Sequence, residues 1–185
     1  ATCLTTAELK KIWEPGSKVS NWNQVRSSFP NESLKLFGPG TDSGTLDSFT
    51  GEINGEADAS RSDYAASEDD NTTVTGVAGE KGGLGYFGFS YFEENMDTLK
   101  ALEIDSGDGC VAPSVAAAQD GTYKPLSRPL FIYVNNAKYS DNEATKAYVD
   151  FYIENLSDIA EIGQFIPLSD ELYSETQSAL EGLGS

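Results

Sequence analysis

The sequence predicts an α/β fold. Segments with the capping residues and apolar spacing of helices alternate along the chain with short apolar runs that are typical of strands. One of these runs, residues 130–134, is continuously apolar and rich in aromatic and β-branched residues, which indicates an interior strand. With 185 residues, of which 38% are hydrophobic, the chain can bury one substantial core. We therefore expect a single domain.

The first helix has the clearest signals. Thr5 and Glu8 have the spacing of a capping box, in which the two side chains satisfy otherwise unpaired N–H groups at the start of a helix. Pro15 cannot continue the helix and marks its end. The apolar stripe between these signals consists of Leu9, Ile12 and Trp13.

The later elements follow from the same kinds of signal. A helix opens at Ser43 and closes at Gly55, and another has Ser67 as its N-cap and stops at Gly79. A longer helix begins at Asp141, and we assign the aromatic residues of its apolar face to the core. That face consists of Ala144, Ala147, Tyr148, Phe151 and Tyr152. The other expected elements are a turn over 21–31, strands over 34–37, 84–89 and 130–134, and shorter helices after Ser157 and Ser169.

Composition excludes several function classes. Twelve basic and thirty acidic residues give a formal charge of −18, which repels nucleic acids and anionic lipid surfaces. No apolar run approaches the ~20 residues that cross a bilayer, so we expect no membrane insertion. Absence of histidine removes the commonest general base, the Ser-His-Asp arrangement and nearly all catalytic zinc sites. We expect no metal and no cofactor.

The two cysteines allow two interpretations. Cys3 and Cys110 are far apart in the sequence and form no CxxC motif, which excludes a zinc knuckle and a thioredoxin-like redox pair. A single long-range disulfide would fit an exported protein. Two unrelated buried thiols are the alternative.

A glycine-rich loop carries the main functional signal. Residues 34–45 read LKLFGPGTDSGT, in which an apolar run leads through the loop to the start of a helix. The first N–H groups of a helix have no internal partner and lie at the positive end of its dipole, so they bind oxyanions. The loop lacks the lysine of a Walker A motif and the glycine spacing of a dinucleotide fingerprint. It predicts either a site for a small compact anion or a helix cap and tight turn that bind nothing.

The wider sequence resembles a known family. The strings CLTTAELKKIWEP, GPGTDSGT, ASRSDYAASEDDN, GGLGYFGFSYFEEN, YKPLSRPLFIYV and IPLSDELY follow one another over nearly the entire chain. Together they closely resemble the periplasmic phosphate-binding proteins of ABC phosphate transporters, the PstS and SphX type. The resemblance implies a type II periplasmic-binding-protein fold, in which two lobes close on one phosphate. This chain would form one lobe, with a mixed central sheet flanked by helices.

The resemblance also implies a function and a site. It implies inorganic phosphate as the ligand, the membrane subunits of an ABC transporter as partners of a full two-lobe protein, a periplasmic or extracellular location, and no enzymatic activity. By matching position, Ser43, Gly44 and Thr45 correspond to the family's anion loop, and Thr41 and Asp42 precede them.

Arg61 is the expected cation of the site. Many relatives carry an arginine just before the anion loop, where this chain has Pro39. A planar guanidinium can bind two oxygens of one anion, so we expect Arg61 to replace that arginine. The alternative is a surface ion pair between Arg61 and Asp58 or Asp63.

Asp42 and Asp63 would select phosphate over sulfate. Near neutral pH phosphate still carries a proton, which a carboxylate can accept in a hydrogen bond and which sulfate cannot offer. The alternative roles are helix capping for Asp42, which we favour, and a solvated surface position for Asp63.

One departure from the family concerns the start of the chain. Complete members begin with a further lobe-building segment, which carries its own anion loop and an aspartate ligand, before the region that matches Cys3 onward. We expect residues 1–129 to form the second-lobe-like region, and residues 130–185 to form a returning strand and C-terminal helices, within one domain.

Three function classes remain open from the sequence. Phosphate binding for uptake, with no chemistry on the ligand, is the leading hypothesis. A non-transport interaction or sensor module could reuse the same lobe. Phosphate-ester hydrolysis with Ser43 or Thr45 as nucleophile ranks last, because neither histidine nor a lysine near the loop is present to activate a hydroxyl.

Overall fold

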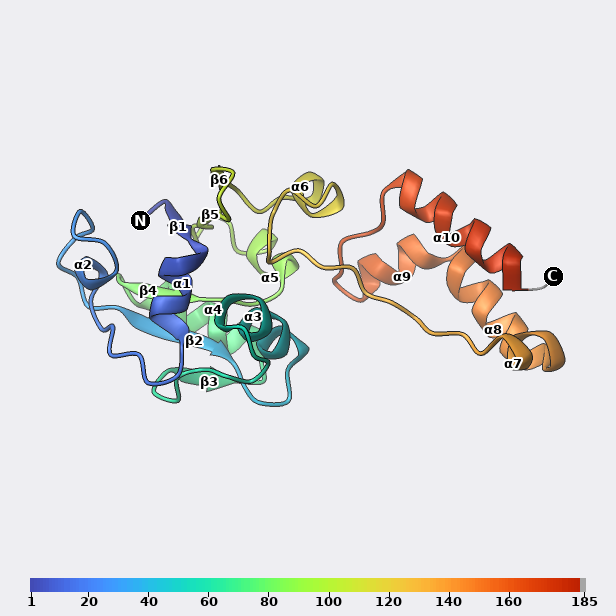
Figure 1. The fold of residues 1–185 in the computed structure, drawn as a ribbon, viewed down its shortest axis with the longest axis horizontal. Helices are drawn as coiled ribbons and strands as arrows, with labels where there is room; N and C mark the ends of the chain where they lie inside the picture. The colour runs from blue at the N-terminus through green and yellow to red at the C-terminus, as the bar shows by residue number, and fades with distance from the viewer. Residues whose placement is uncertain (184–185) are drawn as a thin grey trace. The chain divides into compact units, whose positions relative to one another are not determined.

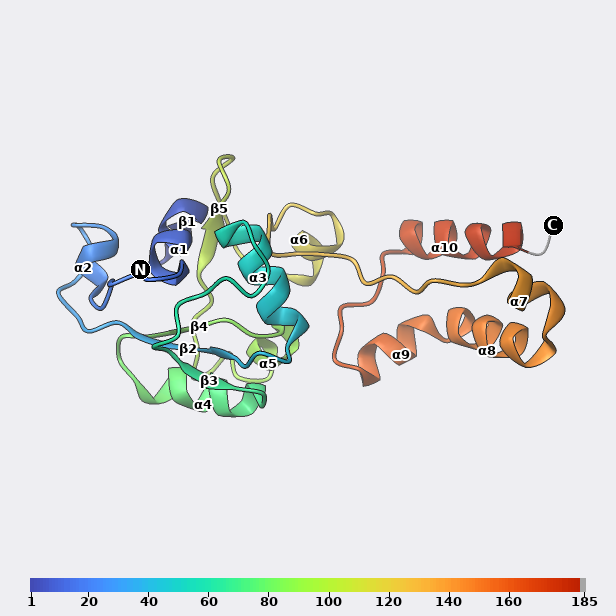
Figure 2. The ribbon, with the colours of Figure 1, turned by 60° about the horizontal axis from the view of Figure 1, so that its bottom comes forward.

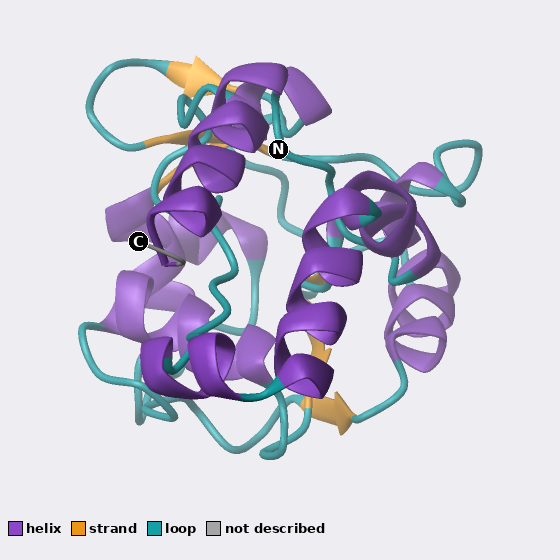
Figure 3. Cartoon of the chain, turned by 90° about the vertical axis from the view of Figure 1, so that its right-hand side faces the viewer, coloured by secondary structure: helices purple, strands orange, loops and turns teal. Residues whose placement is uncertain are grey.

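The computed structural model describes residues 1–183, which form two compact units (Figure 1). Ala1–Arg128 make up the first unit, and the second begins at Pro129. Among the described residues, all strands belong to the first unit, whereas the regular structure of the second is helical. The strands are short, and helices and loops account for most of the chain (Figure 3).

The first unit contains two small sheets. In one, β1 runs parallel to β5, and β5 runs antiparallel to β6. In the other, β2 lies between β3 and β4, and all three strands are parallel. The predicted α/β class is confirmed, with the strands divided between two sheets. The strands are β1 (Cys3–Thr5), β2 (Lys35–Pro39), β3 (Ala65–Ser67), β4 (Gly83–Gly85), β5 (Glu103–Asp105) and β6 (Cys110–Val111).

Helices cover both faces of the parallel sheet (Figure 2). Helix α4 (Asp70–Gly79) lies on one face, so close to the central strand that a Cβ at Gly76 would be 2.4 Å from the ring of Phe37. Only glycine permits this approach, because real Cβ atoms do not come that near to other atoms. Helices α1 (Thr6–Trp13) and α3 (Gly44–Asn54) lie on the other face.

Trp13 is the centre of the core on this second face. Its side chain is 1% exposed, and its ring makes edge contacts with the rings of Phe49, Tyr64 and Tyr86. Tyr86 also stacks on Phe49, with 3.9 Å between the ring centroids. Because buried aromatic rings remove much apolar area from water, this cluster fixes α1 and α3 against the sheet.

The second unit has a much smaller core. Its buried side chains are Tyr139, Val149 and Ile153. The hydroxyl of Tyr139 donates a 2.6 Å hydrogen bond to Asp150, which also accepts a bond from Lys146. The helices of this unit are α7 (Asn136–Asp141), α8 (Glu143–Glu154), α9 (Leu156–Ile162) and α10 (Asp170–Leu183). The remaining helices, α2 (Trp22–Val25), α5 (Phe89–Glu93) and α6 (Val115–Gln119), belong to the first unit.

Several local predictions are confirmed. Thr5 and Glu8 form both bonds of the predicted capping box. Ser43 is the N-cap of α3, and Gly55 closes that helix in the left-handed conformation with a φ of 91°. The strand predicted over 34–37 is β2.

The strand predicted over 84–89 is wrong beyond its first residues. The paired strand β4 ends at Gly85, opposite Phe37 of β2, and α5 begins at Phe89. Strand β2 reaches Pro39 two residues after Phe37, and proline has no N–H to donate to a neighbour. The chain therefore leaves the sheet at Tyr86.

The interior strand predicted over 130–134 is also wrong. Within the described residues this segment pairs with no strand, and Phe131 and Tyr133 are 71% and 93% exposed. An apolar run becomes a strand only where a sheet edge accepts its N–H and C=O groups, and the run itself cannot supply that edge.

Two helix predictions need correction. The N-cap of α4 is Asp69 instead of Ser67. Most of the predicted aromatic face of α8 is not core, because Tyr148 and Phe151 are 69% and 59% exposed. Its third aromatic residue, Tyr152, is half-buried against the core that Val149 and Ile153 form with Tyr139. Helices are present near 157 and after Ser169 as predicted, although α9 already begins at Leu156.

Candidate anion-binding site

The loop of residues 40–43 lies where an α/β sheet usually binds its ligands. It follows the carboxyl end of β2 and leads directly into α3. Strands β3 and β4 run parallel to β2, so their carboxyl ends reach the same edge of the sheet. In open parallel sheets this edge is the usual ligand crevice, because the loops that leave it converge with helix amino ends.

The start of α3 is partly satisfied from within the chain. The N–H of Thr45 donates to Oγ of Ser43 at 3.2 Å, and the N–H of Asp47 donates to the carbonyl of Ser43 at 3.2 Å. Gly44 is the first helical residue, so its N–H has no intrahelical acceptor. Oγ of Ser43 accepts one bond here and still carries its own hydrogen, which can be donated to an anion.

Glu68 covers the other side of the loop. Its Oε1 accepts a 3.3 Å hydrogen bond from the N–H of Asp42. A Cβ at Gly40 would lie 2.0 Å from this same oxygen, so the contact requires glycine at position 40. The sequence alone does not point to Glu68, because no spacing pattern links it to Gly40, and the two residues meet only when β2 and β3 pair.

Asp42 and Thr41 flank the site, and both are exposed. The capping role that we favoured for Asp42 is wrong, because the N-cap of α3 is Ser43. Tyr64 fixes the backbone just before the loop, because its hydroxyl donates a 2.8 Å hydrogen bond to the carbonyl of Pro39. Burial, assisted by the negative charge of Glu68, raises the pKa of the Tyr64 hydroxyl, so it remains a donor at neutral pH.

Arg61 and Asp63 pair with each other. Nε and Nη2 of Arg61 donate to the two carboxylate oxygens of Asp63, at 2.6 and 2.9 Å. Its Nη1 donates to the carbonyls of Ile12 and Val19, at 3.1 and 2.8 Å. Hydrogen bonding from Arg61 holds the pKa of Asp63 below its ordinary value. These contacts tie the residues around α1 together.

The expectation that Arg61 binds an anion is therefore not supported by its contacts. The guanidinium is buried, and every one of its nitrogens donates to a group of the chain itself. Asp63 is correspondingly committed to Arg61 and not to a proton of phosphate. Its partner is one of the two that the sequence offered as alternatives, although the guanidinium is buried instead of lying at the surface.

Arg128 is the arginine that lies at the loop. Its Nη2 donates a 3.3 Å hydrogen bond to the carbonyl of Gly44. Thr45, Ser48 and Arg128 also line one cavity of about 590 Å³, whose walls include Phe87 and other apolar side chains of the first unit. No sequence pattern connects Arg128 to Gly44, since 84 positions separate them.

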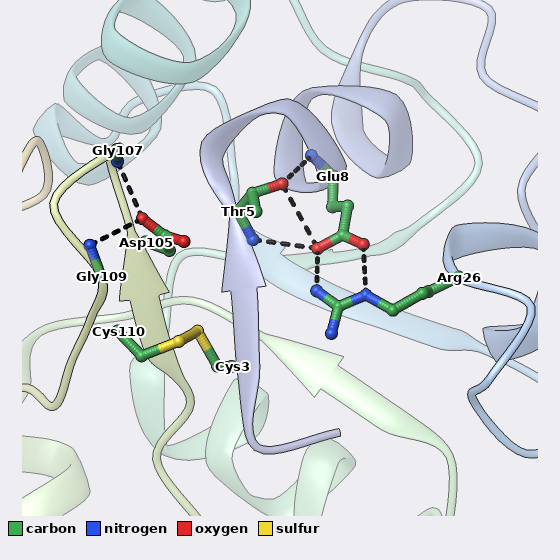
Figure 4. The surroundings of a disulfide bond; sticks show 8 residues. All are labelled: Cys3, Thr5, Glu8, Arg26, Asp105, Gly107, Gly109 and Cys110. Carbon is green, nitrogen blue, oxygen red and sulfur yellow. Dashed lines mark hydrogen bonds and ion pairs between the residues drawn. A yellow bond between two sulfur atoms is a disulfide. The ribbon is translucent and has the colours of Figure 1, made fainter.

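The amino end of the first unit is secured by a disulfide between Cys3 and Cys110 (Figure 4). It links β1 to β6, which are the outer strands of their sheet. Beside it, Arg26 binds both oxygens of Glu8, the capping-box residue of α1. Hydrogen bonding from Arg26 lowers the pKa of Glu8.

Possible metal ligands come together at one place among the described residues. They are Cys3, Glu103 and Cys110, and both sulfurs of this group are joined in the disulfide. A search of the same residues finds no helix with the length and apolarity that crossing a bilayer requires.

Comparison with known proteins places the chain in a family. The family model described as PBP superfamily domain matches residues 1–155. The chain belongs to the PBP superfamily. Its similarity to one solved member, described as a possible phosphate binding protein from Planctomyces limnophilus, has a TM-score of 0.92 and a sequence identity of 44%. That match covers 100% of this chain and 66% of the other.

Curated proteins are also similar to the chain at the level of sequence. Protein SphX of Synechocystis sp. is 49% identical over 173 residues, which are 92% of this chain and 52% of the relative. Phosphate-binding protein PstS of Staphylococcus saprophyticus is 34% identical over 181 residues, which are 97% of this chain and 55% of the relative. The chain thus spans about half the length of the curated relatives it matches.

Proposed function

We propose that this chain binds inorganic phosphate at the start of α3, as part of a solute-binding protein for ABC-type phosphate uptake, and performs no chemistry on it. The observation that carries the proposal is the position of Ser43, Gly44 and Thr45, at the amino end of a helix and at the carboxyl edge of a parallel sheet. Similar proteins that are described as a phosphate-binding protein and a possible phosphate binding protein support this choice of anion.

The donors of the loop suit a tetrahedral oxyanion. The N–H of Gly44 and the hydroxyls of Ser43 and Thr45 can each bond to a different oxygen, and the positive end of the α3 dipole adds a favourable field. These are short-range interactions, so they act despite the formal charge of −18. The same charge slows the encounter with anions at low ionic strength.

Absence of chemistry is part of the proposal. Hydrolysis of a phosphate ester by Ser43 would need a base to take its proton, and the chain contains no histidine. In the described structure Oγ of Ser43 accepts an N–H from Thr45, which is the bond of a helix cap and not of an activated nucleophile.

Partners and location follow from the same proposal. We propose the membrane subunits of an ABC transporter as partners of the whole protein, and a periplasmic or extracellular location. The disulfide supports the location, because such bonds persist in oxidising compartments. We propose further that residues 1–129 serve as the second-lobe-like region and residues 130–185 as the returning segment of one PBP-like domain.

A titration with inorganic phosphate tests the function. In proton–nitrogen correlation spectra, phosphate should shift the amide signals of Gly44 and Thr45 and saturate, whereas equal ionic strength from sodium chloride should not. Thr45→Val should weaken binding roughly 10- to 100-fold, as expected for a lost hydrogen bond to a charged group. Thr72→Val makes the same change in the first turn of α4 and serves as the control.

Two results would contradict the proposal. One is the absence of any saturable shift at the start of α3. The other is binding that Thr45→Val and Thr72→Val weaken equally, since this would place the anion away from the loop.

A further inference from the structure

Arg128 occupies a position that is unfavourable for a cation. Its guanidinium hydrogen bonds to the carbonyl of Gly44, in the first turn of α3. The amino end of a helix carries a partial positive charge, so the helix dipole repels a cation there and favours one at the opposite end. The carbonyl of Gly44 is neutral, so this hydrogen bond gives the guanidinium no counter-charge.

The other arginines of the chain are neutralised by carboxylates. Arg26 binds Glu8, and Arg61 binds Asp63, each through two nitrogens. Arg128 forms no such pair with any residue from 1 to 183. The chain has 30 acidic residues, so the absence of a partner does not reflect a shortage of carboxylates.

We propose that Arg128 is the cation of the anion site and binds the same oxyanion as Ser43, Gly44 and Thr45. The proposal rests on the proposed function, because it assumes an anion at the start of α3. With that anion in place, the guanidinium and the helix dipole both face a negative charge, and their mutual repulsion is replaced by a shared attraction. An arginine suits this role because its planar group can donate to two oxygens of one phosphate.

The surroundings of Arg128 allow this interaction. Its side chain, Thr45 and Ser48 line the same cavity, so the guanidinium and the first turns of α3 open into one space. Gly44 leaves the approach open, and even a Cβ at that position would be 3.6 Å from Nη2, an ordinary contact distance. Arg128 is exposed, so its side chain can turn from the carbonyl of Gly44 to an anion without breaking a packed core.

The test compares phosphate binding by four forms of the 185-residue chain. Each form is titrated with inorganic phosphate and followed by calorimetry or spectroscopy. The dissociation constant of Arg128→Ala should be about 10- to 100-fold higher than that of the parent, and the dissociation constant of Arg128→Lys should lie between the two. Lys35→Ala is the matched control, because it removes the same charge from the opposite, amino end of β2. It should change the dissociation constant less than about twofold, as distant exposed charges are screened.

A second measurement separates binding from a structural role. In phosphate-free buffer Arg128→Ala should unfold at the same temperature as the parent or higher, since it removes a repulsion from α3. If Arg128→Ala binds phosphate as the parent does while Thr45→Val does not, Arg128 is not a ligand and the proposed function stands. If the parent shows no saturable binding, both proposals fail. If Arg128→Ala and Lys35→Ala lose equal affinity, Arg128 contributes only through the net charge of the chain, and its assignment as a ligand is overturned.

Discussion

The two units of the chain differ in how far they bury their aromatic side chains. In residues 1–128 the large aromatic side chains of α1, α3 and the segment after β4 meet each other around Trp13, which is 1% exposed. In the second unit the aromatic residues Tyr148 and Phe151 of α8 are 69% and 59% exposed, and among its described residues the core consists of three buried side chains. Both units carry well-formed, capped helices.

The difference separates helix formation from core formation. Capping bonds lie within a few residues of one another, so a helix can form wherever its cap sequence occurs. Burial of the apolar face needs a second surface, which the sheet of the first unit supplies. An amphipathic pattern therefore predicts a helix more securely than it predicts which of its residues become core.

The largest expected effect concerns the core of the first unit. Trp13→Ala should lower the free energy of unfolding by about 3–5 kcal/mol, because it leaves a cavity among Phe49, Tyr64 and Tyr86. Tyr148→Ala in the second unit should change it by less than about 0.5 kcal/mol. Urea unfolding followed by far-ultraviolet circular dichroism measures both. Equal losses in free energy of unfolding would contradict the difference in core formation between the two units.

The disulfide gives the next largest effect. Joint substitution of Cys3→Ser and Cys110→Ser should lower the free energy of unfolding by about 2–4 kcal/mol, since the bond closes a separation of 107 residues in the unfolded chain. Thermal unfolding with and without a thiol reductant measures it, and the double variant, which has nothing to reduce, is the control. The prediction would be contradicted if the reductant left the melting temperature of the parent protein unchanged.

The smallest effect is a pH dependence at the start of α1. Glu8 has a pKa below its ordinary value, chiefly through hydrogen bonding from Arg26. A lowered pKa in the folded state adds stability above the ordinary pKa, and this stability is lost as the pH falls through the lowered value. Glu8→Gln should therefore cost about 1 kcal/mol at pH 7, and this cost should shrink as the pH falls from the ordinary pKa of a glutamate toward pH 2.

Unfolding measured at both pH values checks this prediction. Glu32→Gln is the matched control, since its partner Lys81 is largely exposed and the pair should contribute less. A cost for Glu8→Gln that stays constant down to pH 2 would show that the loss comes from the helix cap and not from the charge of Glu8.

The candidate site could be predicted only in part. The start of α3 at Ser43 follows from neighbouring residues and was predicted, although the sequence favoured Asp42 and not Ser43 as the capping residue. Arg61 was assigned to the anion because the sequence cannot show that its guanidinium is occupied by Asp63 and by carbonyls more than 40 positions away. Which arginine lies at the loop depends on how the chain returns to α3, and local sequence patterns do not predict this path.

The strand predictions show the same limit. The run that became β2 and the run at 130–134 have similar local character, yet only β2 has strands on both sides. A strand is stabilised by hydrogen bonds to another segment, so the β propensity of its own residues does not decide whether the strand forms.

By itself the sequence determined the α/β class, the capping box of α1 and the loop that opens α3, because each depends on hydrogen bonds and side-chain spacing within a few residues. Tertiary structure alone decided that Glu68 covers Gly40, that Arg128 reaches Gly44 and that two aromatic side chains of α8 are exposed. The first two of these contacts join positions 28 and 84 residues apart, and the third depends on which surfaces meet. The physical reason is that closing such loops is governed by the packing of the whole chain, which no short stretch of sequence encodes.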